Sequence, residues 1–250
     1  MTGRARLALA LALALAAATT AHAAHPLISE DPETQGTGGV EVEIGLAVTR
    51  GEPGGGRTSL LSVQLAYGLA PTIDLLVVPR YIGLRPPDAS REHGFGDTSL
   101  DLKWRFVETD AVQVAVRAGA ELPTGDAARG LGAQGTGVHA VIAVAFPIEP
   151  VQWLVNVGYT RSRAEGQRTS VPFASTAVVY PGKGPGPWQT FVEVAAQANS
   201  DPARSTWPAV ARTGLIWRLA EGLDLDVGLE GRLNRAATRL VFLAGATFWW

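Results

Sequence analysis

The amino-acid sequence predicts an all-β fold: a transmembrane, antiparallel, up-and-down β-barrel of about 12 strands. Three observations predict it. Apolar and polar residues alternate with a period of two in one segment after another between residues 40 and 250. Aromatic residues gather near the segment ends, where barrel strands meet the membrane surfaces. The chain closes on Phe248-Trp249-Trp250, and a terminal aromatic residue is typical of the last strand of bacterial outer-membrane barrels.

The first residues indicate export. Arg4 and Arg6 precede an apolar run over residues 7–18, and a small-x-small cleavage site follows at residues 21–23. The run is too short to cross about 30 Å of hydrocarbon as a helix, which argues against a membrane anchor. We therefore expect a signal peptide over residues 1–23, an N-terminal periplasmic segment able to dock in the lumen over 24–39, and the barrel over 40–250.

Composition argues against several other classes of protein. The formal net charge is −2, and losing Arg4 and Arg6 with the signal leaves about four net negative charges, so no nucleic-acid partner is indicated. The absence of cysteine excludes disulfides, thiolate metal sites and cysteine nucleophiles. Histidine and carboxylate residues show no metal-ligand spacing, and no cofactor is expected. The fold must close by strand pairing and packing.

Twelve segments carry the alternation. Residues 40–48 and 61–67 place Val, Ile, Leu and Tyr on one face and mainly Glu, Ser and Gln on the other. Residues 73–81 and 100–106 follow, the latter with Asp, Lys and Arg between its apolar residues. Residues 112–122, 138–146 and 151–159 are rich in Val and Ala, and 171–180 has the least regular pattern. The last four segments are 188–197, 209–219, 223–233 and 240–250, which makes the number even.

The connections between these segments alternate in length. Tight turns are predicted at residues 70–71, 108–110, 149–150 and 221–222, and longer loops around 51–57, 84–95, 124–134, 163–170 and 199–207. Outer-membrane barrels have this asymmetry, with short periplasmic turns and longer external loops. Two connections fit less well, the Gly/Pro-rich 181–187 and the short 234–238.

Alternation alone does not say which face points outward, because a soluble periplasmic β protein with an apolar core would show it too. The aromatic residues decide in favour of a membrane barrel, since a soluble core would bury them in mid-strand. The predicted export signal and the terminal tryptophan favour the same orientation. We expect the protein in the bacterial outer membrane, with its apolar face on lipid.

The inward face would then be polar, with nearly balanced charges, and such residues can pair across a narrow lumen. One sector, on the third, sixth and seventh segments, would be apolar instead. It could form a track for a hydrophobic solute or a docking face for the N-terminal segment, which offers Leu27 and Ile28. The candidate lumen or substrate-path residues are Leu76, Val78, Arg80, Ile82, Lys103, Arg105, Arg117, Glu121, His139, Val141, Asn156, Glu193, Arg212, Asp226, Glu230 and Arg232.

The predicted external rim is rich in arginine, whereas the tight turns carry mainly acidic residues. Arg50, Arg57 and Arg85 are among the rim residues. Because the guanidinium group matches phosphate with a planar fork, contact with lipopolysaccharide phosphates is one interpretation. A solvated loop surface is the other.

A motif spans the fourth and fifth segments. Gly94-Phe95-Gly96-Asp97 enters a strand that ends in Lys103-Trp104-Arg105, and Leu122-Pro123-Thr124-Gly125-Asp126 ends the next strand. This pattern resembles the outer-membrane transporter family associated with the meta pathway of phenol degradation, over most of the mature chain. The resemblance implies a β-barrel and an uptake channel.

The physical interpretation of this motif is structural. Gly94 and Gly96 permit backbone angles closed to other residues where the loop enters the wall, and Asp97 can accept backbone amide hydrogen bonds there. Pro123 and Gly125 end the neighbouring strand. We expect the motif to shape the barrel rather than to bind solute.

The C-terminal segment carries a barrel-assembly signal. Gly245, Phe248 and Trp250 match the pattern that the barrel-assembly machinery reads, although Leu243 stands where a polar residue is usual. That machinery is therefore an expected partner during biogenesis.

The function predicted from these features is a passive channel or transporter for small, hydrophobic or aromatic molecules. A structural barrel without transport is the alternative, and a soluble periplasmic β protein is a further one. No enzyme is expected. Only one of the histidines, His139, would face the lumen, and no serine–histidine–acid spacing accompanies it. His139 is interpreted as a hydrogen-bonding residue of the lumen.

Overall fold

The computed structural model describes residues 25–52, 56–87, 90–164, 166–182 and 186–250. The signal peptide predicted over residues 1–23 lies outside these residues. Within them the chain forms strands and one short 3-10 helix, η1, Ala127–Arg129. The strands are β1 Val40–Arg50, β2 Arg57–Ala70, β3 Ile73–Val78, β4 Arg80–Arg85, β5 Glu92–Phe95, β6 Thr98–Glu108, β7 Gln113–Leu122, β8 Gly137–Ile148, β9 Val151–Arg161, β10 Ser170–Tyr180, β11 Trp188–Gln197, β12 Ala209–Ala220, β13 Leu223–Arg232 and β14 Leu240–Trp249.

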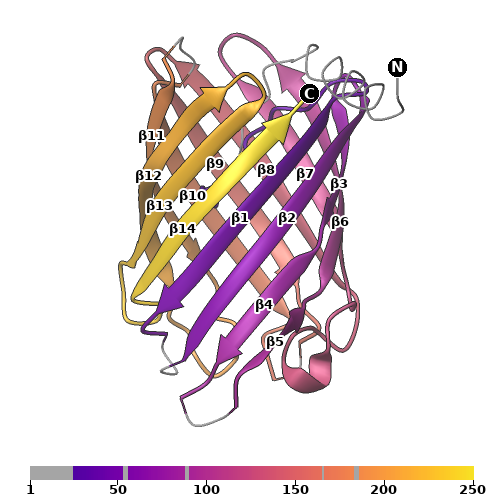
Figure 1. The fold of residues 1–250 in the computed structure, drawn as a ribbon, viewed down its shortest axis with the longest axis vertical. Helices are drawn as coiled ribbons and strands as arrows, with labels where there is room; N and C mark the ends of the chain where they lie inside the picture. The colour runs from indigo at the N-terminus through magenta and orange to yellow at the C-terminus, as the bar shows by residue number, and fades with distance from the viewer. Residues whose placement is uncertain (1–24, 53–55, 88–89, 165, 183–185) are drawn as a thin grey trace, which may run out of the picture.

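These strands form one antiparallel sheet that closes on itself (Figure 1). Each wall strand pairs with its neighbours in the sequence, and β1 pairs with both β2 and β14. The collinear β3 and β4 make one wall strand, and β5 and β6 make the next, so the described strands give a wall of twelve. The predicted all-β, up-and-down barrel is confirmed. None of the helical residues in the described ranges forms a helix long and apolar enough to cross a membrane.

The two faces of the wall have the opposite polarity to a soluble β protein. Leu102, Val192 and Val227 point outward and are 52%, 62% and 56% exposed. Asp101 and Glu193 point inward and are each 1% exposed. Because charged groups are almost never fully buried unless they are paired, the inward face must supply partners for them.

Aromatic side chains lie on the outer surface near the end of the barrel that carries the tight turns. Trp188 on β11 and Trp217 on β12 stack with ring centroids 5.1 Å apart. Phe146 and Trp153 make a similar pair at 5.3 Å on β8 and β9. Outward aromatic residues at strand ends are typical of a membrane–water boundary.

One predicted loop was wrong in extent. The segment expected as a loop around residues 84–95 is mostly a hairpin in which β4 and β5 pair from Tyr81–Phe95 to Leu84–Glu92. The hairpin extends the wall at the lower end in Figure 1. Pro79 interrupts the long strand, because it has no N–H to donate to the ladder, and the Gly/Pro content of this segment masks its strand character.

Candidate functional site

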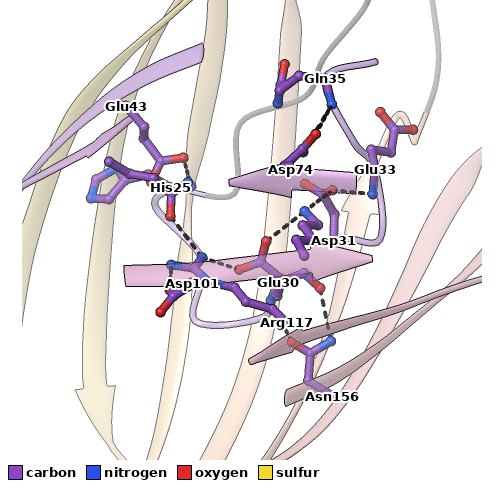
Figure 2. Close-up of polar contacts among 12 residues, drawn as sticks. His25, Glu30, Asp31, Glu33, Gln35, Glu43, Asp74, Asp101, Arg117 and Asn156 are labelled. Atoms are coloured by element: carbon purple, nitrogen blue, oxygen red, sulfur yellow. Dashed lines mark hydrogen bonds and ion pairs between the residues drawn. The ribbon is translucent and has the colours of Figure 1, made fainter. Parts of the chain in front are cut away.

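The N-terminal segment, residues 25–39, runs inside the barrel before it enters β1. Pro26, Ser29, Asp31 and Pro32 are buried, although they belong to no strand. Figure 2 shows side chains of this segment directed at groups on the inner wall. Irregular backbone away from water must find hydrogen-bond partners, and the barrel wall supplies them.

On one side, the Glu30 carboxylate bridges two cations of the wall. Lys103 on β6 and Arg117 on β7 stand directly opposite each other in the strand register. The Lys103 Nζ atom lies 2.7 Å from Glu30 Oε1, and the Arg117 Nη1 atom lies 2.8 Å from Glu30 Oε2. Asp31 lies 3.5 Å from the same lysine. Glu30, which lies in the lumen and belongs to no strand, thus compensates both positive charges. Figure 2 shows it beside Arg117.

The wall continues this network toward the loop end. Arg117 also binds Asp101 at 2.6 Å, and the His139 Nε2 atom lies 2.9 Å from the other oxygen of Asp101. His139 Nδ1 faces Glu121 at 4.0 Å, and Glu121 pairs with Arg80 at 2.6 Å. His139 therefore stands between two carboxylates, which fits a structural hydrogen-bonding role.

On the opposite side, wall residues bind the backbone of the segment. The two oxygens of Glu193 on β11 accept hydrogen bonds from the backbone N–H groups of Ile28, at 2.8 Å, and Ser29, at 2.6 Å. Asn156 on β9 makes two bonds with Glu30, accepting from its N–H and donating to its carbonyl. These contacts do not depend on the side chains of the segment.

His25 lies over the seam between the first and last strands. Its Nδ1 atom is 2.8 Å from Asp226 on β13, and its backbone N–H donates to Glu43 on β1. Gly45 and Gly245 are directly paired in the β1–β14 ladder. A Cβ at Gly45 would come within 2.6 Å of the His25 ring, and one at Gly245 within 2.4 Å. Only glycine at both positions leaves room for the imidazole.

Further contacts fix both ends of the segment. Arg212 on β12 donates to the Pro26 carbonyl at 2.6 Å and also binds Glu230 on β13. At the turn end, the N–H of Gln35 donates to Asp74 on β3. The segment therefore crosses the lumen from one wall to the other, from the middle of the barrel to its turn end.

Leu27 packs against an apolar cluster on β8 to β11, formed by Ala145, Leu154, Ala177, Val179 and Phe191. Leu154 belongs to the apolar sector for which the sequence left two uses open, a solute track and a docking face. At this place the sector carries the segment. Ile28 is different, because it faces a cavity toward the loop end.

Two carboxyl groups of the segment have shifted pKa values. Burial raises the pKa of Glu30, but the charges and hydrogen bonds of Lys103 and Arg117 outweigh it and lower that pKa to about 2. For Asp31, burial dominates, and with the nearby Glu33 and Glu30 charges it raises the pKa from 3.8 to about 6 against the effect of Lys103.

The loop-end part of the lumen contains open space on the β10–β13 side. A cavity of about 500 Å³ lies between the external loops and the segment, with Ile28, Phe173, Ala195 and Val210 on its apolar side. Gln197 and Glu230 are among its polar lining residues. Its volume falls in the range of small-molecule sites, about 300 to 1,000 Å³.

The motif shared by the fourth and fifth predicted strands shapes the mouth of the barrel. The Asp97 carboxylate accepts hydrogen bonds from the N–H groups of Gly125, at 3.0 Å, and Ala133, at 2.7 Å. Asp126 accepts from two N–H groups of η1. The predicted backbone role of Gly94 and Gly96 was wrong, because neither has a positive φ. They are needed for close packing instead, since Leu131, 2% exposed, lies against both. The contacts of Asp97 are those expected of a structural motif.

The remaining predicted residues occupy four environments. Leu76, Val78 and Val141 are buried on the inner face. Ile82 is half-buried at the loop end beside Gly96. Arg105 pairs with Glu108 near a tight turn at 3.0 Å, and Arg232 is exposed at the end of β13. Among the described residues there is no cluster of histidine and carboxylate groups that could hold a metal ion.

The C-terminal strand explains its departure from the usual assembly signal. Leu243 faces inward at 7% exposure, and its side chain packs over Gly228 on β13, so an apolar residue fits this position. Trp250 is 37% exposed, and its backbone exchanges two hydrogen bonds of 3.0 Å with Val40. The sequence analysis did not identify Gly45 or Gly245 as the residues that leave room for the His25 ring. The two glycines in the first and last strands were a signal that could have shown it.

Comparison with known proteins identifies the family. Residues 23–250 match the family model described as "Putative MetA-pathway of phenol degradation". The chain belongs to this family. Comparison with curated protein sequences gives no match. The resemblance found on the residues 94–126 is therefore confirmed over nearly the whole chain.

The chain is also similar in fold to solved outer-membrane barrels. The chain is similar to the COG4313 outer membrane channel from Pseudomonas putida F1, at 12% identity over 90% of this chain and 100% of that chain, with a TM-score of 0.70. It is also similar to the NanC porin, at 8% identity over 84% and 98% of the two chains, with a TM-score of 0.56. At these identities the likeness describes the fold alone.

Proposed function

We propose that this protein is an outer-membrane channel for small hydrophobic or aromatic molecules, gated by its own N-terminal segment. The observation that carries the proposal is the divided lumen. A cavity of about 500 Å³, lined by both apolar and polar side chains, lies toward the loop end, and residues 25–35 lie in the lumen between this cavity and the turn end. A solute that enters from outside would meet Ile28 at the bottom of this cavity.

The lining favours a small molecule with both an apolar body and a polar group. Phe173, Ala195 and Val210 offer apolar surface, while Gln197 and Glu230 offer hydrogen-bond partners. The volume suits a single-ring aromatic compound. The fold is shared with the outer-membrane channel from Pseudomonas putida F1, and the family description names phenol degradation, which support the same class of solute.

The placement in the outer membrane rests on the outward apolar surface. Exposed side chains such as Leu102 and Val192 form a continuous apolar wall, and a surface of this kind needs lipid around it. Export by a signal peptide over residues 1–23 belongs to the same proposal. Recovery of the full chain with the outer-membrane fraction, in a heat-modifiable folded form, tests it, and recovery as a soluble monomer would contradict it.

Planar-bilayer recording tests transport. We expect low conductance for the mature chain, an increase when residues 25–35 are deleted, and a concentration-dependent block of the current by phenol. The deleted variant must still show the heat-modifiable gel shift of a closed barrel. No current in either form, together with no effect of phenol, would favour a structural barrel instead.

A further inference from the structure

Three arginines form a row across adjacent strands at the loop end of the barrel. Arg57 on β2 is directly paired with Arg85 on β4 in the strand register. On the other side of β2, the β1 ladder runs to Val48–Ser59, and Thr49 exchanges hydrogen bonds with Thr58, which places Arg50 beside Arg57. Because neighbouring strands lie about 4.8 Å apart, the row spans about 10 Å.

All three side chains belong to the outer face of the wall. Successive residues of a strand alternate between the faces, so Arg50 shares the face of Leu46, and Arg57 that of Leu61. These two leucines are 42% and 39% exposed. Arg85 likewise shares the face of Tyr81, 38% exposed. The Arg50 guanidinium lies over the outward Phe242 ring of β14, 5.8 Å from its centroid.

The row lacks compensating anions in the described part of the chain. Arg50, Arg57 and Arg85 are exposed, and none of them forms an ion pair with any of the described residues. The nearby Glu52 accepts a hydrogen bond from Thr49 with one carboxylate oxygen, and its other oxygen lies beside Gly56, but it forms no ion pair with the three arginines. Like charges directly opposite each other destabilise a sheet, so an external anion here would relieve repulsion as well as bind.

The surroundings indicate what that anion is attached to. The three arginines, with Gly51, Gly56 and Pro86, line a shallow cavity of about 410 Å³. The apolar surface of Leu46, Leu61 and Phe242 begins next to it on the same face, toward the middle of the strands. A ligand that fits both parts carries phosphate at the level of the arginines and acyl chains along the wall.

We infer that the row Arg50–Arg57–Arg85 binds the phosphorylated headgroup of an outer-leaflet saccharolipid. Each guanidinium can donate two parallel hydrogen bonds to phosphate oxygens, which lysine does not match. The phenyl ring of Phe242 holds Arg50 in position by a cation–π contact. The inference rests on the proposed outer-membrane placement but not on transport.

Native mass spectrometry of the full mature chain in detergent tests the inference, with bisphosphorylated lipid A as the probe. We expect the triple variant Arg50→Gln, Arg57→Gln, Arg85→Gln to bind about tenfold more weakly than the wild type. The matched control is Arg161→Gln, Arg204→Gln, Arg235→Gln, which removes the same charge from exposed positions elsewhere at the loop end and should bind like the wild type. Raising the salt concentration should weaken wild-type binding and leave the triple variant little changed.

Three results would overturn the inference: equal binding by the wild type and the triple variant, equal binding of dephosphorylated lipid A, or full competition by inorganic phosphate. A second readout excludes misfolding. Without lipid the triple variant should unfold at the same temperature as the wild type or higher, and lipid A should raise that temperature more for the wild type. Recovery of the wild type as a soluble protein would overturn the placement itself, whereas membrane insertion without lipid A binding overturns this inference alone.

Discussion

The barrel holds its N-terminal segment by different means on its two sides. On the β6–β7 side, charged side chains of the segment meet charged side chains of the wall, and Glu30 compensates Lys103 and Arg117. On the β11 side, the wall residue Glu193 binds backbone N–H groups. The first contact depends on the identity of one residue of the segment, whereas the second would accept almost any residue there. The first side therefore selects this segment, and the second fixes its path.

The largest effect is expected from breaking the selective side. Glu30→Ala leaves Lys103 and Arg117 opposite each other without their shared anion, and removing one partner of a buried ion pair costs about 3–5 kcal/mol. The segment should leave the lumen, and single-channel conductance should rise to the level of the deletion of residues 25–35. Glu149→Ala, at an exposed turn, is the control. Unchanged conductance in Glu30→Ala would show that the two sides do not differ as described.

A smaller, local effect is expected on the other side. Glu193→Gln keeps one acceptor oxygen but loses the charge and the second acceptor, which costs about 1–3 kcal/mol. Hydrogen exchange at the Ile28 and Ser29 amides should become about tenfold faster, equivalent to about 1.4 kcal/mol. The amide of Gln35, held by Asp74, serves as the internal control and should keep its protection. Equal acceleration at all three amides would mean that the segment moves as one body.

The smallest effect is a dependence on pH. The pKa of Asp31 is raised by burial from 3.8 to about 6, so between these values the docked segment binds more protons than the free one. Docking therefore weakens as the pH rises through this interval, while Glu30, with a pKa of about 2, stays ionised. Conductance of the wild type should be higher at pH 7 than at pH 4.5. Asp31→Asn should remove the difference, and its persistence would assign it to another group.

Period-two alternation predicted the wall because every strand has one face toward the outside and one toward the lumen. Even the irregular segment 171–180 forms a regular strand, β10, since its neighbours on both sides fix its register. The hairpin of β4 and β5 escaped prediction because Pro86, Pro87 and the glycines around it indicate a loop. Local composition cannot show that a turn of this kind sits on an extension of the wall.

The alternating pattern could not predict the contacts of the N-terminal segment, because this segment is not a strand. Leu27 and Ile28 stood out as apolar, yet only Leu27 packs on the apolar cluster, while Ile28 lines the cavity. The residues that hold the segment, Glu30 and His25, lie in an aperiodic stretch and find partners far away in the sequence. Alternation predicted the charge balance of the lumen. It could not predict that the carboxylate between Lys103 and Arg117 is Glu30, which belongs to the N-terminal segment and not to a strand.

The position of His25 has a consequence for the order of events in biogenesis. The ribosome makes this residue before every strand, but its places of contact, Asp226 and Gly245, belong to the last two strands. The earliest part of the chain can therefore reach its final position only after the latest part has arrived. The His25 side chain can therefore dock over the β1–β14 junction only in a cylinder that has already closed.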